Sequence, residues 1–100
     1  MLVVTAKFDV KPGKKGALLE AAKDYVRITR TDPGCLSFNL YSSTETENQL
    51  MFFEEWESRG DLDVHAQSEH MKRWKAIKSE FAEGDSVLQI YNATESNNVN

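Results

Sequence analysis

Residues 50–75, LMFFEEWESRGDLDVHAQSEHMKRWK, decide the fold of this chain. They begin as a strongly apolar strand, turn at Ser58 and continue into helical sequence that carries both histidines of the chain and Trp74. Ser58 stands three residues before Asp61, a spacing that resembles a capping box at a helix start, and Ser68 is a second such cap. The stretch therefore brings titratable and aromatic side chains to the junction of a strand and a helix, where a pocket can form.

Hydrophobic periodicity predicts the other elements. Period-two alternation and helical spacing of apolar residues indicate strands at 2–10, 35–43, 49–57 and 87–93, and helices at 14–31 and 69–82. A polar hairpin loop fills residues 44–48, and we expect Gly84 to end the second long helix. The chain thus reads as one domain over residues 1–93 followed by a polar, frayed tail at 94–100.

The order strand, helix, strand, strand, helix, strand predicts an α+β fold of the ferredoxin-like plan, a four-stranded antiparallel sheet with both helices on one face. In the third strand, alternate positions set Phe52 and Trp56 against Met51 and Phe53, so both faces are apolar. The helices cover only one face, and leaving several such side chains in water would cost on the order of 5 kcal/mol. We therefore expect a homodimer in which a second copy covers the open face.

Composition narrows the classes of partner. Twelve basic and sixteen acidic residues give a net charge of -4, which argues against a nucleic-acid partner. No apolar run approaches the roughly 20 residues that span a bilayer, and the amino-terminal residues do not read as a signal peptide, so no membrane partner is expected. The single Cys35 fits a reducing compartment, and we expect a cytoplasmic protein.

Two short motifs follow one another in the opening stretch, E-x-W-x-S at residues 54–58 and H-x(4)-H-M-K at residues 65–72. In this order and spacing they resemble the antibiotic biosynthesis monooxygenase domain family, and the resemblance extends over about residues 2–92. It implies a dimeric α+β barrel with a pocket between helices and sheet in each subunit. It also implies oxidation of a quinol or polyphenolic ring by O2 without a cofactor, because the electron-rich ring itself activates oxygen.

The same family contains other activities. Isomerases of a phosphorylated signalling sugar need a cationic pocket group, for which Lys7, Arg27 or Lys72 would have to point inward. A third alternative is a non-catalytic member that binds an aromatic ligand. The haem-degrading branch is not supported, since its characteristic positions fall on residues that do not match it: Ala6, His65 and about Lys75.

Candidate site residues come from the same region. His65 is the first candidate for a general base, since an imidazole with a pKa near 6.5 can take the proton of a phenolic hydroxyl. His70 is a second candidate, and Glu54 is a third, because burial would raise the pKa of its carboxyl group. Candidates to bind the small aromatic substrate are Trp56, Trp74, Phe52, Phe38 and Tyr25, with Asn39 orienting a substrate oxygen.

Each candidate also has a structural interpretation. The histidines can tether backbone near a helix start, Glu54 can reach solvent or bridge subunits, and most aromatic residues at this spacing form core. On a continuous helix His65 and His70 would lie about 140° apart, and two ligands do not make a zinc site, so no metal is expected. The five glycines are isolated turn residues without a phosphate loop or dinucleotide motif, and no cofactor is expected.

Overall fold

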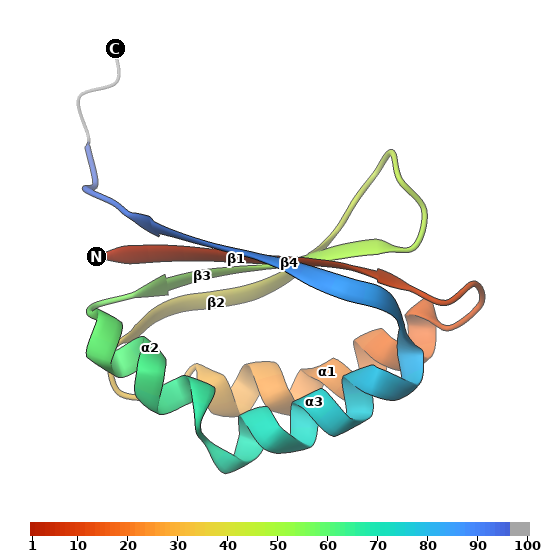
Figure 1. The fold of residues 1–100 in the computed structure, drawn as a ribbon, viewed down its shortest axis with the longest axis horizontal. Coiled ribbons are helices and arrows are strands. Elements are labelled where there is room, and N and C mark those ends of the chain that lie inside the picture. The colour runs from red at the N-terminus through yellow and green to blue at the C-terminus, as the bar shows by residue number, and fades with distance from the viewer. Residues whose placement is uncertain (97–100) are drawn as a thin grey trace.

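The computed structural model describes residues 1–96 and shows a four-stranded antiparallel sheet with its helices packed on one face (Figure 1). The elements in chain order are β1 (Leu2–Val10), α1 (Lys15–Thr29), β2 (Cys35–Ser42), β3 (Gln49–Trp56), α2 (Arg59–Ala66), α3 (Glu69–Phe81) and β4 (Ala82–Asn92). The strand order β2-β3-β1-β4 is that of the ferredoxin-like plan, so the predicted fold class is confirmed. Part of the expected tail, residues 97–100, lies outside the described residues.

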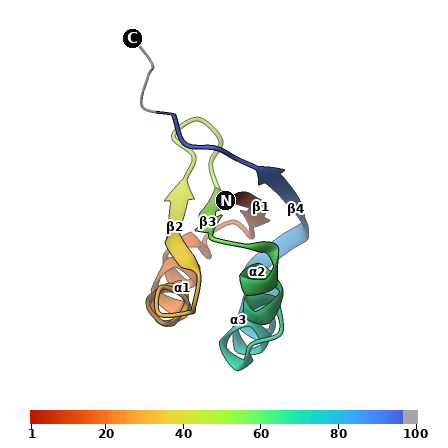
Figure 2. The same ribbon diagram turned by 90° about the vertical axis from the view of Figure 1, so that its left-hand side faces the viewer.

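The core lies between the sheet and the helices. Along β1 and β3 the even-numbered residues face the helices, because successive side chains of a strand point to opposite faces. Seen end-on, α1 lies under the β2 side of the sheet, whereas α2 and α3 lie under the β4 side (Figure 2). None of the helices in residues 1–96 is long and apolar enough to cross a membrane.

Both predicted helix caps are present. The Ser58 hydroxyl accepts a hydrogen bond from the backbone N–H of Asp61 at the start of α2, and the Ser68 hydroxyl accepts one from Met71 at the start of α3. The chain leaves helical geometry between Ala66 and Glu69, so α2 and α3 are separate helices with different axes. This break positions the two histidines, as described below.

The prediction that Gly84 ends the second long helix is wrong. α3 ends at Phe81 and β4 begins at residue 82 rather than 87. Gly84 lies inside β4 with φ +75°, where the register with β1 shifts between Lys7 and Asp9. Glycine tolerates this left-handed backbone, so the residue makes a bulge in a strand instead of a helix end.

The sheet face turned away from the helices mixes apolar and polar side chains. Met51 and Phe53 are half-buried near its middle, whereas Tyr41, Val87 and Tyr91 are exposed. The large apolar residues expected there are therefore present, and nothing within residues 1–96 covers them completely.

The loop at residues 31–34 packs closely against the start of α2. Gly34 has φ +79°, and a Cβ atom added to it would lie 2.2 Å from the side chain of Asp61. Asp61 is itself held by the Ser58 hydroxyl, which donates to its Oδ2 atom at 2.9 Å. Gly34 is therefore required both for its backbone conformation and for its lack of a side chain.

Replacing Gly34 by alanine should lower the free energy of unfolding by at least about 1 kcal/mol more than the same change at Gly13. Both glycines have left-handed backbones, with φ +79° and +78°, so both variants incur that strain. An added Cβ at Gly13 meets no atom within 4 Å, so only Gly34 adds a clash. Urea unfolding followed by circular dichroism measures the difference, and equal losses would contradict the close approach to α2.

Candidate functional site

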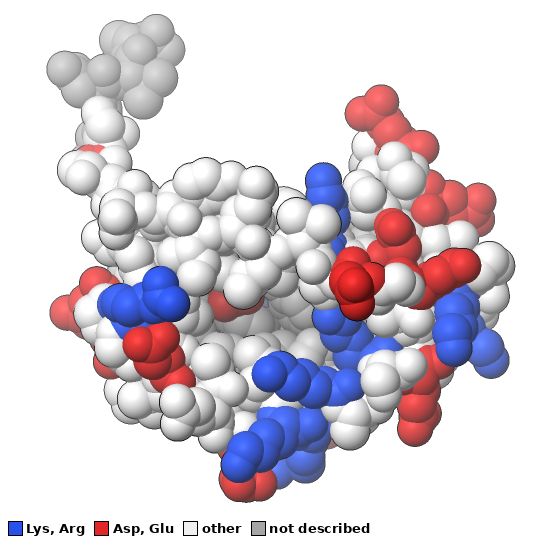
Figure 3. Space-filling model, viewed as in Figure 1, with Lys and Arg blue, Asp and Glu red and all other residues white. Residues whose placement is uncertain are grey.

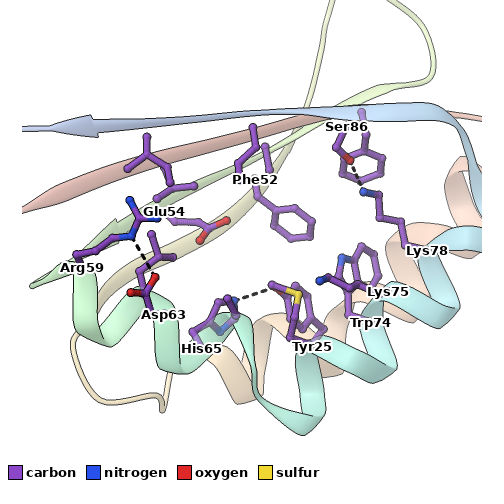
Figure 4. A pocket seen from close by; sticks show the side chains of 18 residues that line it. Tyr25, Phe52, Glu54, Arg59, Asp63, His65, Trp74, Lys75, Lys78 and Ser86 are labelled. Carbon is purple, nitrogen blue, oxygen red and sulfur yellow. Dashed lines mark hydrogen bonds and ion pairs between the residues drawn. The ribbon is translucent and has the colours of Figure 1, made fainter.

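A cavity of about 320 Å³ lies between the helix side of the sheet and the helices, and it opens beside β4. Its volume is at the lower end of the range for ligand sites, which indicates a small ligand. Figure 3 shows a hollow on the face of the molecule where the cavity opens, with lysine and arginine side chains gathered over α3 below the hollow. Figure 4 shows the side chains that line the cavity.

Three aromatic rings form one corner of the cavity. Tyr25 from α1 and Trp74 from α3 are stacked, with ring centroids 5.0 Å apart and planes within 3° of parallel. Phe52 from β3 meets both edge-on, at 5.7 Å and 5.6 Å. The ring of Phe52 is thus perpendicular to the parallel rings of Tyr25 and Trp74. An apolar corner of this shape suits a planar aromatic ligand.

Glu54 from β3 is a buried carboxyl group that points into the cavity (Figure 4). Burial raises its pKa to about 7, although the indole N–H of Trp56, which donates to Oε1 at 3.0 Å, opposes the rise. No other hydrogen bond of the described residues engages this carboxyl group. Near neutral pH it exists in both protonation states, so it can accept or donate a proton.

His65 from α2 is 1% exposed, and both of its ring nitrogens have partners. Nδ1 lies 2.8 Å from Oδ2 of Asp32, and Nε2 lies 3.1 Å from the hydroxyl of Tyr25. Because a carboxylate only accepts, Nδ1 carries the hydrogen, and Nε2 accepts from Tyr25. Burial lowers the pKa of His65, with Asp32 opposing, and so favours a neutral imidazole that can take a proton on its cavity side.

Tyr25 lies beside His65, and both side chains line the cavity. Burial raises the pKa of the Tyr25 phenol, and the nearby Glu54 charge raises it further. Tyr25 therefore remains protonated near neutral pH and acts as a hydrogen-bond donor.

Asp32 also accepts a hydrogen bond from His70. No pattern in the sequence pointed to Asp32 as a site residue. Its Oδ2 atom lies 2.8 Å from Nε2 of His70, so one carboxylate oxygen accepts from both imidazoles. The separation of about 140° that a continuous helix would give does not apply, because the chain breaks between α2 and α3 and both rings contact Asp32. Their centroids are 5.5 Å apart.

Asp32, His65 and His70 form a group whose donor atoms all lie within 4.8 Å of one another. Two imidazoles and a carboxylate are a common ligand set for divalent metals, so these residues could hold one. A metal would have to replace both N–H bonds to Asp32. It would also lie behind His65, since neither Asp32 nor His70 lines the cavity.

The structure brings some of the predicted site residues together and not others. Those that line the cavity are Glu54, His65, Tyr25, Phe52 and Trp74. His70 lies outside it on Asp32, and the buried rings of Phe38 and Trp56 lie behind the wall, Trp56 with its centroid 4.8 Å from that of His65. Asn39 does not reach the cavity: it follows Phe38 in β2, so it points the other way, and its Oδ1 accepts from Arg30 at 2.8 Å.

The cationic residues of the cavity differ from those expected. Lys7 is exposed on the opposite side of β1, Arg27 pairs with Asp24, and Lys72 pairs with Glu69. The cations that line the cavity are Arg59, Lys75 and Lys78. The position of Lys78 could have been predicted from the sequence. It follows Trp74 by four residues and therefore shares the helix face of Trp74.

Comparison with known proteins gives relatives that share this fold. The chain is 28% identical over 94 residues to the Synechocystis protein sll1783, covering 94% of this chain but 64% of that protein's length. It is 33% identical over 75 residues to "Putative monooxygenase Rv0793" of Mycobacterium tuberculosis, covering 75% of this chain and 73% of the relative.

Solved structures agree with the sequence relatives. The structure of Rv0793 superimposes with a TM-score of 0.86 and covers 96% of this chain and 97% of that one. A crystal structure described as an antibiotic biosynthesis monooxygenase, 28% identical, has a TM-score of 0.87 over 95% of this chain and all of that one. Residues 1–77 also match the family model described as antibiotic biosynthesis monooxygenase, and the chain therefore belongs to that family.

Proposed function

We propose that this protein oxidises a small hydroxylated aromatic ring, a quinol or polyphenol, with O2 and without a cofactor. The observation that carries the proposal is a cavity in which an aromatic corner adjoins two proton acceptors, Glu54 and His65. The family assignment supports the same class of reaction. A planar ring held against Tyr25 and Trp74 would have its hydroxyl group within reach of either acceptor.

The chemistry begins with removal of the ring's hydroxyl proton. Glu54 can accept it directly, or the hydroxyl can donate to Tyr25 while Tyr25 donates to Nε2 of His65. The resulting anion transfers an electron to O2, and the ring radical and superoxide combine to form a carbon–oxygen bond. Loss of water then leaves a hydroxyquinone: one oxygen atom enters the ring, the other leaves as water, and the ring supplies all the electrons.

Surrounding residues serve this step by excluding water and holding the acceptors. Trp56 fixes the Glu54 carboxyl group through its indole N–H, and Asp32 fixes the tautomer of His65. The apolar walls keep the anion poorly solvated and therefore reactive toward oxygen. The protein thus acts by orienting the ring and controlling its proton.

A second candidate function is isomerisation of a phosphorylated small molecule. The cations Arg59, Lys75 and Lys78 at the cavity favour an anionic ligand and so supply what this activity needs. The three aromatic rings favour the oxidation of a planar substrate instead. A member that binds an aromatic ligand without turnover would show binding but no oxygen uptake.

We also propose that two copies assemble through the open sheet face into a dimeric α+β barrel. Met51 and Phe53 lie in the middle of that face, with Tyr41, Val87 and Tyr91 exposed around them. An apolar area of this kind on a small domain is typical of an interface. Polar residues interspersed on the face, such as Lys7 and Glu55, would fix the register of the two copies.

Oxygen uptake tests the reaction. With reduced naphthoquinone and no added cofactor, the wild-type protein should consume O2 faster than autoxidation, and the double variant His65→Gln, Glu54→Gln, which lacks both acceptors, should lose about 100-fold in kcat/KM. Asn39→Ala is the matched control, because Asn39 does not line the cavity, and it should keep full activity. Uptake at the autoxidation rate across a panel of quinols would refute the proposal.

The pH dependence of stability tests the buried Glu54. Its pKa rises from 4.5 to about 7 on folding, so the stabilisation it gives is fully present below pH 4.5 and is lost as the pH rises through 7. This loss should be on the order of 3 kcal/mol. His65, whose pKa is lowered, has the opposite effect and destabilises the fold as the pH falls below its ordinary 6.5.

Glu54→Gln should remove only the carboxyl contribution, since His65 is present in both proteins and cancels in the difference. Urea unfolding at pH 5 and pH 8 should show the variant gaining stability relative to the wild type at the higher pH. Parallel profiles for the two proteins would mean that Glu54 is not buried as described.

Sedimentation equilibrium at micromolar concentration tests the assembly. The expected mass is twice the chain mass of 11.4 kDa. Phe53→Glu should dissociate the dimer, because it introduces a charge in the middle of the interface. Val64→Glu, which adds the same charge at an exposed site on α2, should leave it intact. A folded wild-type species of 11.4 kDa would rule out the dimer.

A further inference from the structure

Lys78 is a half-buried cation at one end of the cavity. It projects from α3, its amine donates a hydrogen bond to the Ser86 hydroxyl, and it lies 5.0 Å from the centroid of the Phe8 ring. Burial lowers the pKa of Lys78, the charge of Lys75 lowers it further, and Asp85 opposes both. The bulge in β4 lies at this end, because Ser86 falls between Glu83 and Val87, where the register with β1 shifts.

Among the residues that the structure describes, no acidic side chain forms an ion pair with Lys75 or Lys78. Within residues 1–96 the lysine and arginine side chains that form ion pairs are Lys23, Arg27, Arg59 and Lys72. Burying an ammonium group against apolar surface without a paired anion costs free energy. An anion that entered the cavity would remove that cost for Lys78 and the repulsion between Lys78 and Lys75.

The polar groups of the cavity are separated into two ends. Figure 4 shows Glu54 and His65 toward the α2 end and Lys75, Lys78 and Ser86 toward the other, with Phe52, Tyr25 and Trp74 between them. The third cation, Arg59, is at the α2 end and is already paired with Asp63 at 3.1 Å. A ligand that satisfies both ends therefore has a hydroxyl group and an anionic group on opposite sides of a planar apolar body.

We propose that the cavity binds an aromatic hydroxy acid, whose ring lies against the corner formed by Phe52, Tyr25 and Trp74 and whose carboxylate binds Lys78, with Lys75 in support. The proposal rests on the proposed function for the hydroxyl end and adds the substrate class. Glu54 fixes the orientation of the ligand in the cavity, because a ligand carboxylate beside Glu54 would be repelled when Glu54 is ionised.

Binding of two probes that differ only in the charged group tests this subsite without any oxidation. 6-Hydroxy-2-naphthoate carries its hydroxyl and carboxylate at opposite ends of the ring system, and 2-naphthol lacks the carboxylate. Isothermal titration calorimetry on the full chain should give about tenfold tighter binding for the naphthoate. The preference should weaken at high salt, as expected for a charge contact.

Variants identify the residue. Lys78→Met replaces the charged side chain with an unbranched apolar one and should reduce the preference to less than twofold, whereas Lys78→Arg should retain most of it. Lys72→Met is the matched control, because Lys72 is on the same helix but outside the cavity, and its preference should equal that of the wild type. Circular dichroism checks that all three variants fold.

Each outcome bears on the proposal. Equal affinities for the two probes, no binding of either, or a preference that survives Lys78→Met in a folded protein would overturn the anionic subsite. Ribose 5-phosphate should not displace the naphthoate, and displacement would replace the aromatic acid by an aliphatic phosphate ligand. A preference for the naphthoate without oxygen uptake from any quinol would keep the subsite and refute the oxidation.

Discussion

One carboxylate oxygen organises the candidate site. Oδ2 of Asp32 accepts hydrogen bonds from His65 and His70 at 2.8 Å each, and these bonds fix the orientation and tautomer of the imidazole that faces Tyr25. Asp32 is held in place because its loop packs against α2 at Gly34, where there is no room for a side chain. The chemistry of the cavity therefore depends on a contact between a loop and a helix on its outer side.

The cavity itself follows from how the helices cover the sheet. α1 packs under β2, and α2 and α3 lie under the β4 side without closing on β4, whose residues Leu88 and Ile90 are 60% and 37% exposed. The space that remains is lined by apolar side chains, and its few polar groups stand at its two ends.

Period and capping signals made much of this structure predictable. β1 has the predicted bounds, and both serine caps begin helices, because these features depend on neighbours within a few residues. Gly84 was misread because a glycine looks the same in a helix end and in a strand bulge. Glu54 and His65 were both predicted to lie near a pocket, and both line the cavity, because the strand and helix that carry them are adjacent in sequence.

Asp32 was missed because its partners are 33 and 38 residues away and its own surroundings read as a turn. The topology offered an indirect signal. β2 and β3 are antiparallel, and Cys35 pairs with Trp56, so the loop before β2 must lie beside the segment that follows β3. The cavity and the hydrogen bonds of Asp32 lie on two sides of His65. The cavity opens beside β4, whereas the hydrogen bonds of Asp32 lead from His65 to His70, which is 11% exposed. His65 is therefore joined to the protein surface by a hydrogen-bonded row that does not pass through the cavity.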